Sequence, residues 1–219
     1  MAFDFRDLSV PIIVAPMAGG PSTPELAAAG TNAGGLGFVA AGYLTAEAFG
    51  ERLTAARGLT AGPMGANLFV PQPSAGTRED IELYAKALAS EAGRYGVQLG
   101  EPRFDDDHWA AKIEVLLDVR PDVASFTFGV PSAEEYRRLR EVGVTVVGTV
   151  TTLAEARTAI ARGVDAVAVQ GPSAGGHRGT FDPAVQPASQ PFPLCWVLQK
   201  RCYLSLRLPI SGRRPCDFA

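Results

Sequence analysis

Short apolar runs recur along the chain, and a segment with helical signals follows each of them. A nearly continuous apolar run of about four to eight residues is typical of a strand that is buried on both faces of a parallel sheet. Such runs end in Gly, Pro or polar loop residues here, as strands do. We predict six strands, at residues 10–17, 36–40, 65–70, 123–128, 144–147 and 166–169.

The segments between these runs carry signals for helix starts and ends. Thr23 precedes Pro24, so a cap and a proline at the first position begin a helix, which we expect Gly30 to end. Two capping boxes begin later helices, and a glycine follows each. The predicted helices are residues 24–30, 45–53, 78–94 (polar), one amphipathic helix after residue 107, one from Ser132 and Glu135 to Gly143, and one from Thr152 and Glu155 to Gly163.

Six strand-helix units in succession indicate an α/β fold, and we predict an incomplete (β/α)8 TIM-type barrel with about six βα units. A doubly wound sheet would fit the same alternation. Against a dinucleotide-binding version of that sheet, Gly34, Gly35 and Gly37 run into a strand instead of opening a helix after one, and they lack the G-x-G-x-x-G spacing.

The composition is typical of an ordinary soluble globular chain, with 219 residues, 47% hydrophobic residues and a formal charge of -3. No run of 18 apolar residues is present, and Asp4 and Asp7 lie where a secretory signal would be basic, so we expect a cytoplasmic protein without a membrane span. The slight acidity and the scattered arginines argue against nucleic acid as a partner.

The composition changes after Pro183. From residue 184 onward the only acid is Asp217, against five bases, and all three cysteines lie there, at 195, 202 and 216. Their spacing suits neither a metal site nor an even set of disulfides. We therefore predict two parts, a partial barrel at residues 1–183 and an aberrant or non-homologous tail at residues 184–219.

Chemistry in an α/β barrel is expected in loops that follow the carboxyl ends of strands. The sixth predicted strand runs into residues 170–179, QGPSAGGHRG, whose adjacent glycines let the backbone approach a flat or phosphorylated ligand. His177 could accept a proton or bind a polar substrate there, and Arg178 adds a permanent positive charge. A flexible turn without function is an equally good interpretation of this loop.

Three other polar or flexible side chains are candidates. Asn67 lies within an apolar strand, where its amide needs partners that either a ligand or neighbouring backbone can supply. Met17 lies at the mouth of the first strand, although such a methionine is more often core filling. His108 follows three aspartates at a helix start, where helix initiation is the better interpretation; consecutive residues cannot converge on one metal ion.

Three segments carry a family resemblance: PIIVAPMAG from Pro11, GANLFVP around Asn67, and QGPSAGGHRG from Gln170. They look like nitronate monooxygenases, also called 2-nitropropane dioxygenases, over residues 10–183. The resemblance implies a (β/α)8 barrel that binds FMN without a covalent bond and oxidises alkyl nitronates with oxygen to carbonyl compounds and nitrite. Small-molecule nitronates or nitroalkanes and oxygen are then the expected partners.

By the same resemblance, His177 faces the substrate, hydrogen-bonds the nitronate oxygens and acts as a base towards neutral nitroalkanes. The residues implied to contact or border FMN are Met17, Asn67, Gln170, Gly175 and Gly176.

The chain also departs from the family pattern, because the family's last two strands carry the glycine-rich loops that hold the FMN phosphate, and no equivalent follows Pro183. We therefore expect a C-terminally truncated member with unpaired strand edges. Two alternatives stay open. One is an FMN-dependent enoyl thioester reductase of the related barrel family, and the other is an inactive fragment that binds no flavin.

Overall fold

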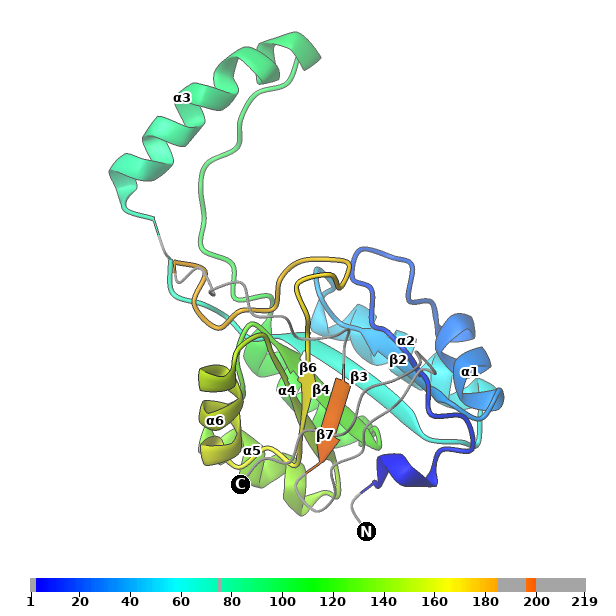
Figure 1. The fold of residues 1–219 in the computed structure, drawn as a ribbon. Helices are drawn as coiled ribbons and strands as arrows, with labels where there is room; N and C mark the ends of the chain where they lie inside the picture. The colour runs from blue at the N-terminus through cyan, green and yellow to red at the C-terminus, as the bar shows by residue number, and fades with distance from the viewer. Residues whose placement is uncertain (1–2, 75, 185–195, 200–219) are drawn as a thin grey trace.

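The computed structural model describes residues 3–74, 76–184 and 196–199, which form a curved sheet with helices on its outer side (Figure 1). The strands are β1 (Ile13–Val14), β2 (Leu36–Ala40), β3 (Met64–Phe69), β4 (Val123–Thr127), β5 (Thr145–Val150), β6 (Ala166–Val169) and β7 (Trp196–Gln199). The helices are the 3-10 turn η1 (Phe5–Asp7), α1 (Pro24–Asn32), α2 (Ala46–Leu59), α3 (Arg78–Tyr95), α4 (Trp109–Val119), α5 (Ala133–Glu141) and α6 (Leu153–Arg162).

The strand order settles the choice between the two α/β architectures. Strands β1 to β6 are parallel and lie side by side in chain order, each paired with the next. A doubly wound sheet reverses its order at a switch point, whereas a barrel adds every strand on the same side. The six parallel units are thus an incomplete α/β barrel, which confirms the predicted fold class.

The seventh strand departs from the barrel pattern. β7 pairs with β6 in an antiparallel register, with Val169 opposite Trp196 and Ala166 opposite Gln199. One edge of the six-strand barrel segment therefore has a backbone partner. The rest of the predicted tail, residues 185–195 and 200–219, lies outside the described residues.

The two faces of the sheet bury different sets of side chains. On the outer face, alternate strand residues such as Val39, Leu68 and Phe126 pack under the helices. On the concave inner face, the amino-terminal half of the strands forms a smaller apolar cluster that η1 covers. Its buried members are Phe5, Leu36, Phe38, Val123, Val147 and Ala166.

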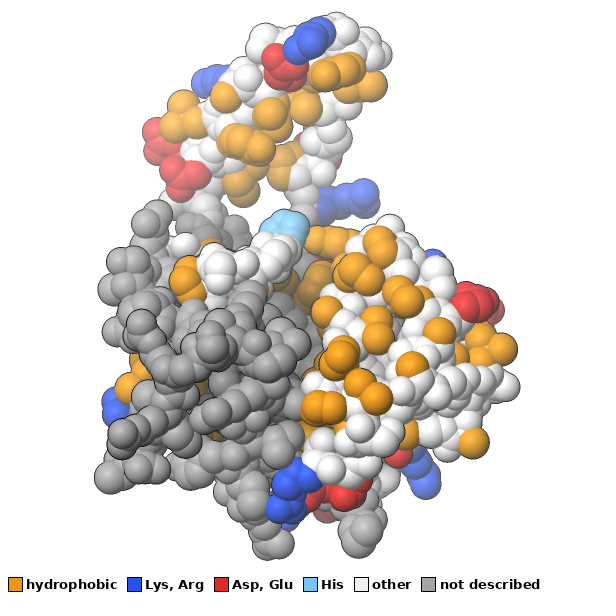
Figure 2. Space-filling view, turned by 45° about the vertical axis from the view of Figure 1, so that its right-hand side comes forward, with side chains coloured by type: hydrophobic (Ala, Val, Ile, Leu, Met, Phe, Trp, Pro, Cys, Tyr) orange, Lys and Arg blue, Asp and Glu red, His pale blue; other side chains and the backbone are white. Residues whose placement is uncertain are grey.

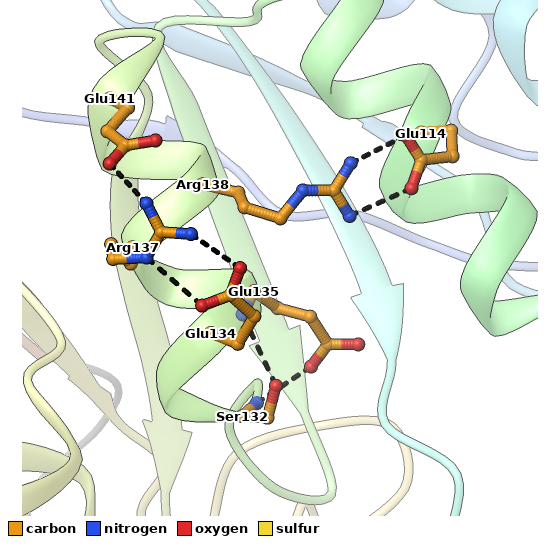
Figure 3. Close-up of polar contacts among 7 residues, drawn as sticks. All are labelled: Glu114, Ser132, Glu134, Glu135, Arg137, Arg138 and Glu141. Carbon is orange, nitrogen blue, oxygen red and sulfur yellow. Dashed lines mark hydrogen bonds and ion pairs between the residues drawn. The ribbon is translucent and has the colours of Figure 1, made fainter.

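Helix caps and surface ion pairs define where the outer helices begin and how they associate (Figure 3). Ser132 and Glu135 form the predicted capping box of α5, and Thr152 and Glu155 form that of α6. Arg138 reaches from α5 to α4, where its guanidinium donates to both carboxylate oxygens of Glu114 at 2.9 and 2.7 Å. Within α5, Arg137 pairs with two glutamates of its own helix, Glu134 and Glu141.

Three local predictions were wrong in detail; the second helix, predicted to end at residue 53, continues to Leu59. α1 does not end at Gly30 but continues to Asn32, because Gly30 is a packing position: a Cβ there would lie 2.3 Å from Cγ2 of Val14. The strand expected at residues 10–17 has only two paired residues, since prolines at 11 and 16 lack the N–H that a ladder needs.

Helix α3 projects away from the sheet, and an extended segment returns beside it (Figure 1). It carries none of the buried residues of the core, yet apolar side chains such as Ile81, Tyr84 and Tyr95 lie exposed on this arm, as Figure 2 shows for its hydrophobic surface in orange. Among the described residues, no helix combines the length and the apolar character needed to cross a bilayer.

Candidate active site

Polar side chains replace apolar ones where the concave face reaches the carboxyl ends of the strands. Leu68 packs under the helices, so its neighbour Asn67 points to the opposite, concave side, because successive strand residues alternate between faces. The same alternation places Ser125, Thr127 and Thr149 on that side. This end of the sheet is where α/β barrels place their chemistry.

Asn67 is 4% exposed, and its amide nitrogen is held entirely by the neighbouring strand β4. Nδ2 lies 3.0 Å from Ser125 Oγ, 3.1 Å from Thr127 Oγ1 and 3.2 Å from the Ser125 carbonyl oxygen. These acceptors fix the orientation of the amide. No residue in the described part of the chain donates to Oδ1, so that oxygen keeps its capacity to accept a hydrogen bond.

Gln170, the first residue after β6, closes the glycine-rich loop on itself. Its Nε2 donates to the carbonyl oxygen of His177 at 2.9 Å, and its Oε1 accepts the backbone N–H of Gly179 at 2.7 Å. One donor hydrogen and one acceptor lone pair of the amide stay free. The loop is therefore a defined structure at its base and not an unconstrained turn.

The end of this loop lies over the strands that hold Asn67. A Cβ at Gly179 would come within 3.1 Å of the Thr127 methyl and 3.2 Å of the Thr149 methyl, so the glycine permits the close approach. Since Thr127 also accepts from Asn67, the loop and the buried amide meet through one threonine. The structure thus brings together Asn67, Gln170 and the loop that carries His177.

The outer part of the loop is open to solvent. His177 is exposed, and nothing lies within 4 Å of a Cβ placed on Gly175 or Gly176. Gly176 also has a φ of +81°, which favours glycine. Beside His177, the Nε of Arg178 is buried and has no hydrogen-bond partner among the described residues.

Met17 lies in the loop after β1, at the same end of the sheet (Figure 1). Its backbone N–H donates to the buried hydroxyl of Ser22 at 2.8 Å, and its side chain is 42% exposed. The side chain is therefore not core filling. No hydrogen bond between described residues joins this loop to residues 170–179.

His108 occupies the N-cap position of α4 with a φ of +55°, but its side chain makes no capping hydrogen bond. The aspartates before it accept hydrogen bonds from backbone N–H groups, and one of them also forms an ion pair. Asp106 accepts the N–H of His108, while Asp107 accepts that of Tyr43 and lies 2.7 Å from Nζ of the buried Lys112. These contacts give the acids structural partners on different elements.

Glu155, which the sequence predicted only as a helix cap, also contacts the chain that follows the glycine-rich loop. Its second carboxylate oxygen reaches the segment just after the glycine-rich loop, where it accepts from Thr180 and Phe181 at 2.9 Å each. Partial burial raises its pKa, but hydrogen bonds from Phe181 and Thr151 outweigh that effect, so the pKa is lowered from 4.5. A capping-box pattern carries no signal for such a long-range contact.

A hollow of about 400 Å³ lies at the opposite, amino-terminal end of the strands. Arg57 and Asp122 lie in its wall and satisfy each other at 2.9 Å, and Arg57 also donates to the carbonyl of Gly62. Because Arg57 and Asp122 already have partners, we interpret this hollow as a structural feature of the sheet's far end.

The family model described as "Nitronate monooxygenase" matches residues 5–193. The chain belongs to the nitronate monooxygenase family. Within it, the nitronate monooxygenase of Paraburkholderia phytofirmans is 37% identical over 206 residues, covering 91% of this chain and 55% of that protein. A probable nitronate monooxygenase of Staphylococcus haemolyticus is 37% identical over 182 residues, covering 80% of this chain and 49% of its own length.

Solved structures are also similar to this chain. A nitroalkane oxidase from Streptomyces ansochromogenes is 48% identical, with a TM-score of 0.77 over 81% of this chain and 51% of that chain. FabK from Thermotoga maritima, as an M276A mutant, is 26% identical with a TM-score of 0.58. The chain spans about half the length of these relatives.

Proposed function

We propose that this chain forms the ring-facing part of an FMN site that oxidises alkyl nitronates with oxygen to carbonyl compounds and nitrite. The observation that carries the proposal is the position of the His177 loop. Gln170 holds that loop over Thr127, and the same threonine accepts a hydrogen bond from Asn67. Membership of the nitronate monooxygenase family supports the reaction class.

Unused polar capacity at this end of the sheet fits the polar edge of a flavin ring. Among the described residues, the buried Arg178 Nε has no hydrogen-bond partner, and Asn67 Oδ1 accepts no hydrogen bond. Open space around Gly175 and Gly176 leaves room for a flat ligand against the backbone. The glycine-rich loops expected to hold the FMN phosphate belong to two further parallel strands, and the described sheet has only the first six.

In the proposed reaction, the chain's own residues bind and orient the substrate. The His177 imidazole hydrogen-bonds a nitronate oxygen, and with a neutral nitroalkane it removes the proton from the carbon that bears the nitro group. The guanidinium of Arg178 stabilises the resulting anion. When bound, FMN supplies the electron transfer and oxygen chemistry.

The proposal is tested by titrating the purified chain with FMN and then assaying the complex with propionate 3-nitronate and oxygen. We expect His177→Asn to abolish most of the nitrite release while flavin binding persists. His108→Asn is the matched control, because the chain has two histidines and His108 occupies the N-cap position of α4 and not the glycine-rich loop. Equal activity in the wild type and His177→Asn would refute the catalytic assignment.

A further inference from the structure

One carboxylate fastens the exit of the glycine-rich loop to the barrel. Oε2 of Glu155 accepts the N–H and the hydroxyl of Thr151 at 2.6 and 2.8 Å, together with the N–H of Thr152 at 3.2 Å. Oε1 accepts the hydroxyl of Thr180 and the N–H of Phe181, both at 2.9 Å. Five donors from two separate segments therefore converge on a single side chain.

A second capping box in the same chain shows that these loop contacts are not part of helix capping. Glu135 has the same role in α5, where its Oε2 accepts the N–H of Ser132 at 2.8 Å. Its other oxygen accepts the indole N–H of Trp109 on the neighbouring helix at 2.7 Å. Only in α6 is the second oxygen directed to the chain that follows the His177 loop.

The loop is thereby held at both ends by side chains. Gln170 fixes its entry through the His177 carbonyl and the Gly179 N–H, and Glu155 fixes its exit one and two residues after Gly179. Between these two fixed points lie the open glycines and the exposed His177. Rotation of the loop about its base therefore requires that one of the two anchors break.

We propose that Glu155 is a positioning residue, whose carboxylate sets the placement of the His177 loop over the carboxyl end of β4 and β5. Its link to catalysis rests on the function proposed above, whereas its effect on the loop does not. The chemistry favours a carboxylate, because each of its oxygens faces at least one backbone N–H, which can only donate, and an ionised acid has only acceptor sites. A glutamine would present its NH2 group to one set of N–H donors.

The test compares amide hydrogen exchange in Glu155→Gln, Glu135→Gln and the wild type. In Glu155→Gln we expect exchange at Gly179 and Phe181 to accelerate about tenfold or more, the amount that corresponds to losing one partly buried hydrogen bond to a charged group. The imidazole signal of His177 should shift while that of His108 stays in place. Glu135→Gln removes the equivalent cap contact and should leave both loop amides and both imidazoles unchanged.

Two further variants separate positioning from folding. Thr152→Ala removes the side-chain cap of α6 but none of the loop contacts, so loop exchange should stay as in the wild type. Thr180→Val removes one donor to Glu155 without touching the helix and should accelerate exchange at Phe181. The second variant keeps the proposal testable if Glu155→Gln does not fold.

Flavin binding provides the functional comparison. If the wild type binds FMN, Glu155→Gln should weaken FMN binding or lower kcat by at least the factor by which it accelerates amide exchange in the loop. Glu135→Gln should stay close to the wild type in both. If the wild type binds no flavin, the proposed function fails, and hydrogen exchange still decides the role of Glu155. Loop exchange that is equal in Glu155→Gln and Glu135→Gln would overturn the proposal.

Discussion

At the scale of single residues, Asn67 and Glu155 are held by partners that lie far from them along the chain. Asn67 was recognisable because an amide interrupts an apolar strand, and His177 because it follows adjacent glycines at a strand end. That Asn67 donates to Ser125 and Thr127 depends on the register of β3 against β4, across 58 and 60 residues of chain. The same holds for Glu155, because its contact with Phe181 depends on where the loop returns.

Replacing Asn67 should reveal the cost of leaving the β4 hydroxyls without their donor. We expect Asn67→Ala to lower the free energy of unfolding by about 1–3 kcal/mol and to weaken flavin binding. Asn32→Ala is the control, since it removes an amide that donates to Leu59 at the amino end of the sheet. Urea unfolding and flavin titration of both variants check this, and similar flavin affinity in the two would contradict the site assignment.

The lowered pKa of Glu155 predicts an acid-sensitive contribution to stability. Its folded pKa lies below 4.5, so the unfolded chain binds the proton more readily. The stabilisation is therefore complete above about pH 4.5, the unfolded value, and is lost as the pH falls through the lowered folded value. As the pH is lowered from 5 through the folded pKa of Glu155, the free energy of unfolding of Glu155→Gln should fall less than that of the wild type. Urea unfolding measures both, and parallel pH curves would contradict this.

At the scale of elements, local signals predicted most helices and strands, and close packing decided the exceptions. The caps at Thr23, Thr45, Ser132 and Thr152 are present because they depend on neighbouring residues alone. Gly30 was misread as a helix end because its reason for being glycine is contact with another element. The glycines from 34 to 37 likewise permit close packing of α1 and the chain before β1 against β2.

Gly37 offers the clearest test of this packing. A Cβ there would lie 1.8 Å from the Ala27 carbonyl oxygen of α1, which is backbone and cannot rotate away. We expect Gly37→Ala to destabilise the fold by about 3 kcal/mol or more. Gly58→Ala, within α2 and with nothing within 4 Å of its Cβ, should stabilise it by about 1 kcal/mol. Thermal and urea unfolding measure the stability of the two variants. A similar loss of stability in Gly37→Ala and Gly58→Ala would contradict the packing argument.

At the scale of the whole molecule, the half-barrel leaves one side of its sheet open. The barrel class followed from the repeated strand-helix pattern, whereas the antiparallel β7 did not, because that pattern predicts only parallel additions. β1 is the first strand in the sheet order and pairs only with β2 in the described structure. Ile12 beside it is 55% exposed, and Leu26 of α1 is 38% exposed.

This open side predicts association through the β1 edge. Exposed apolar side chains next to an unpaired strand favour pairing with another chain. Ile12→Lys should therefore raise the highest concentration at which light scattering still finds the protein monomeric. Leu59→Lys places the same charge at an equally exposed position at the end of α2, and it should have a smaller effect. A larger effect of Leu59→Lys would exclude the β1 edge as the contact.

The most direct test of the central claim is to compare the binding of FMN and of riboflavin to the purified chain. Quenching of the flavin fluorescence measures both affinities. If the six-strand barrel segment holds the ring-facing part of the site, both ligands should bind, with affinities within about threefold of each other, and His177→Asn should keep that binding. Failure of both ligands to bind would contradict the account, and the family membership would then describe the ancestry of this chain and not its activity.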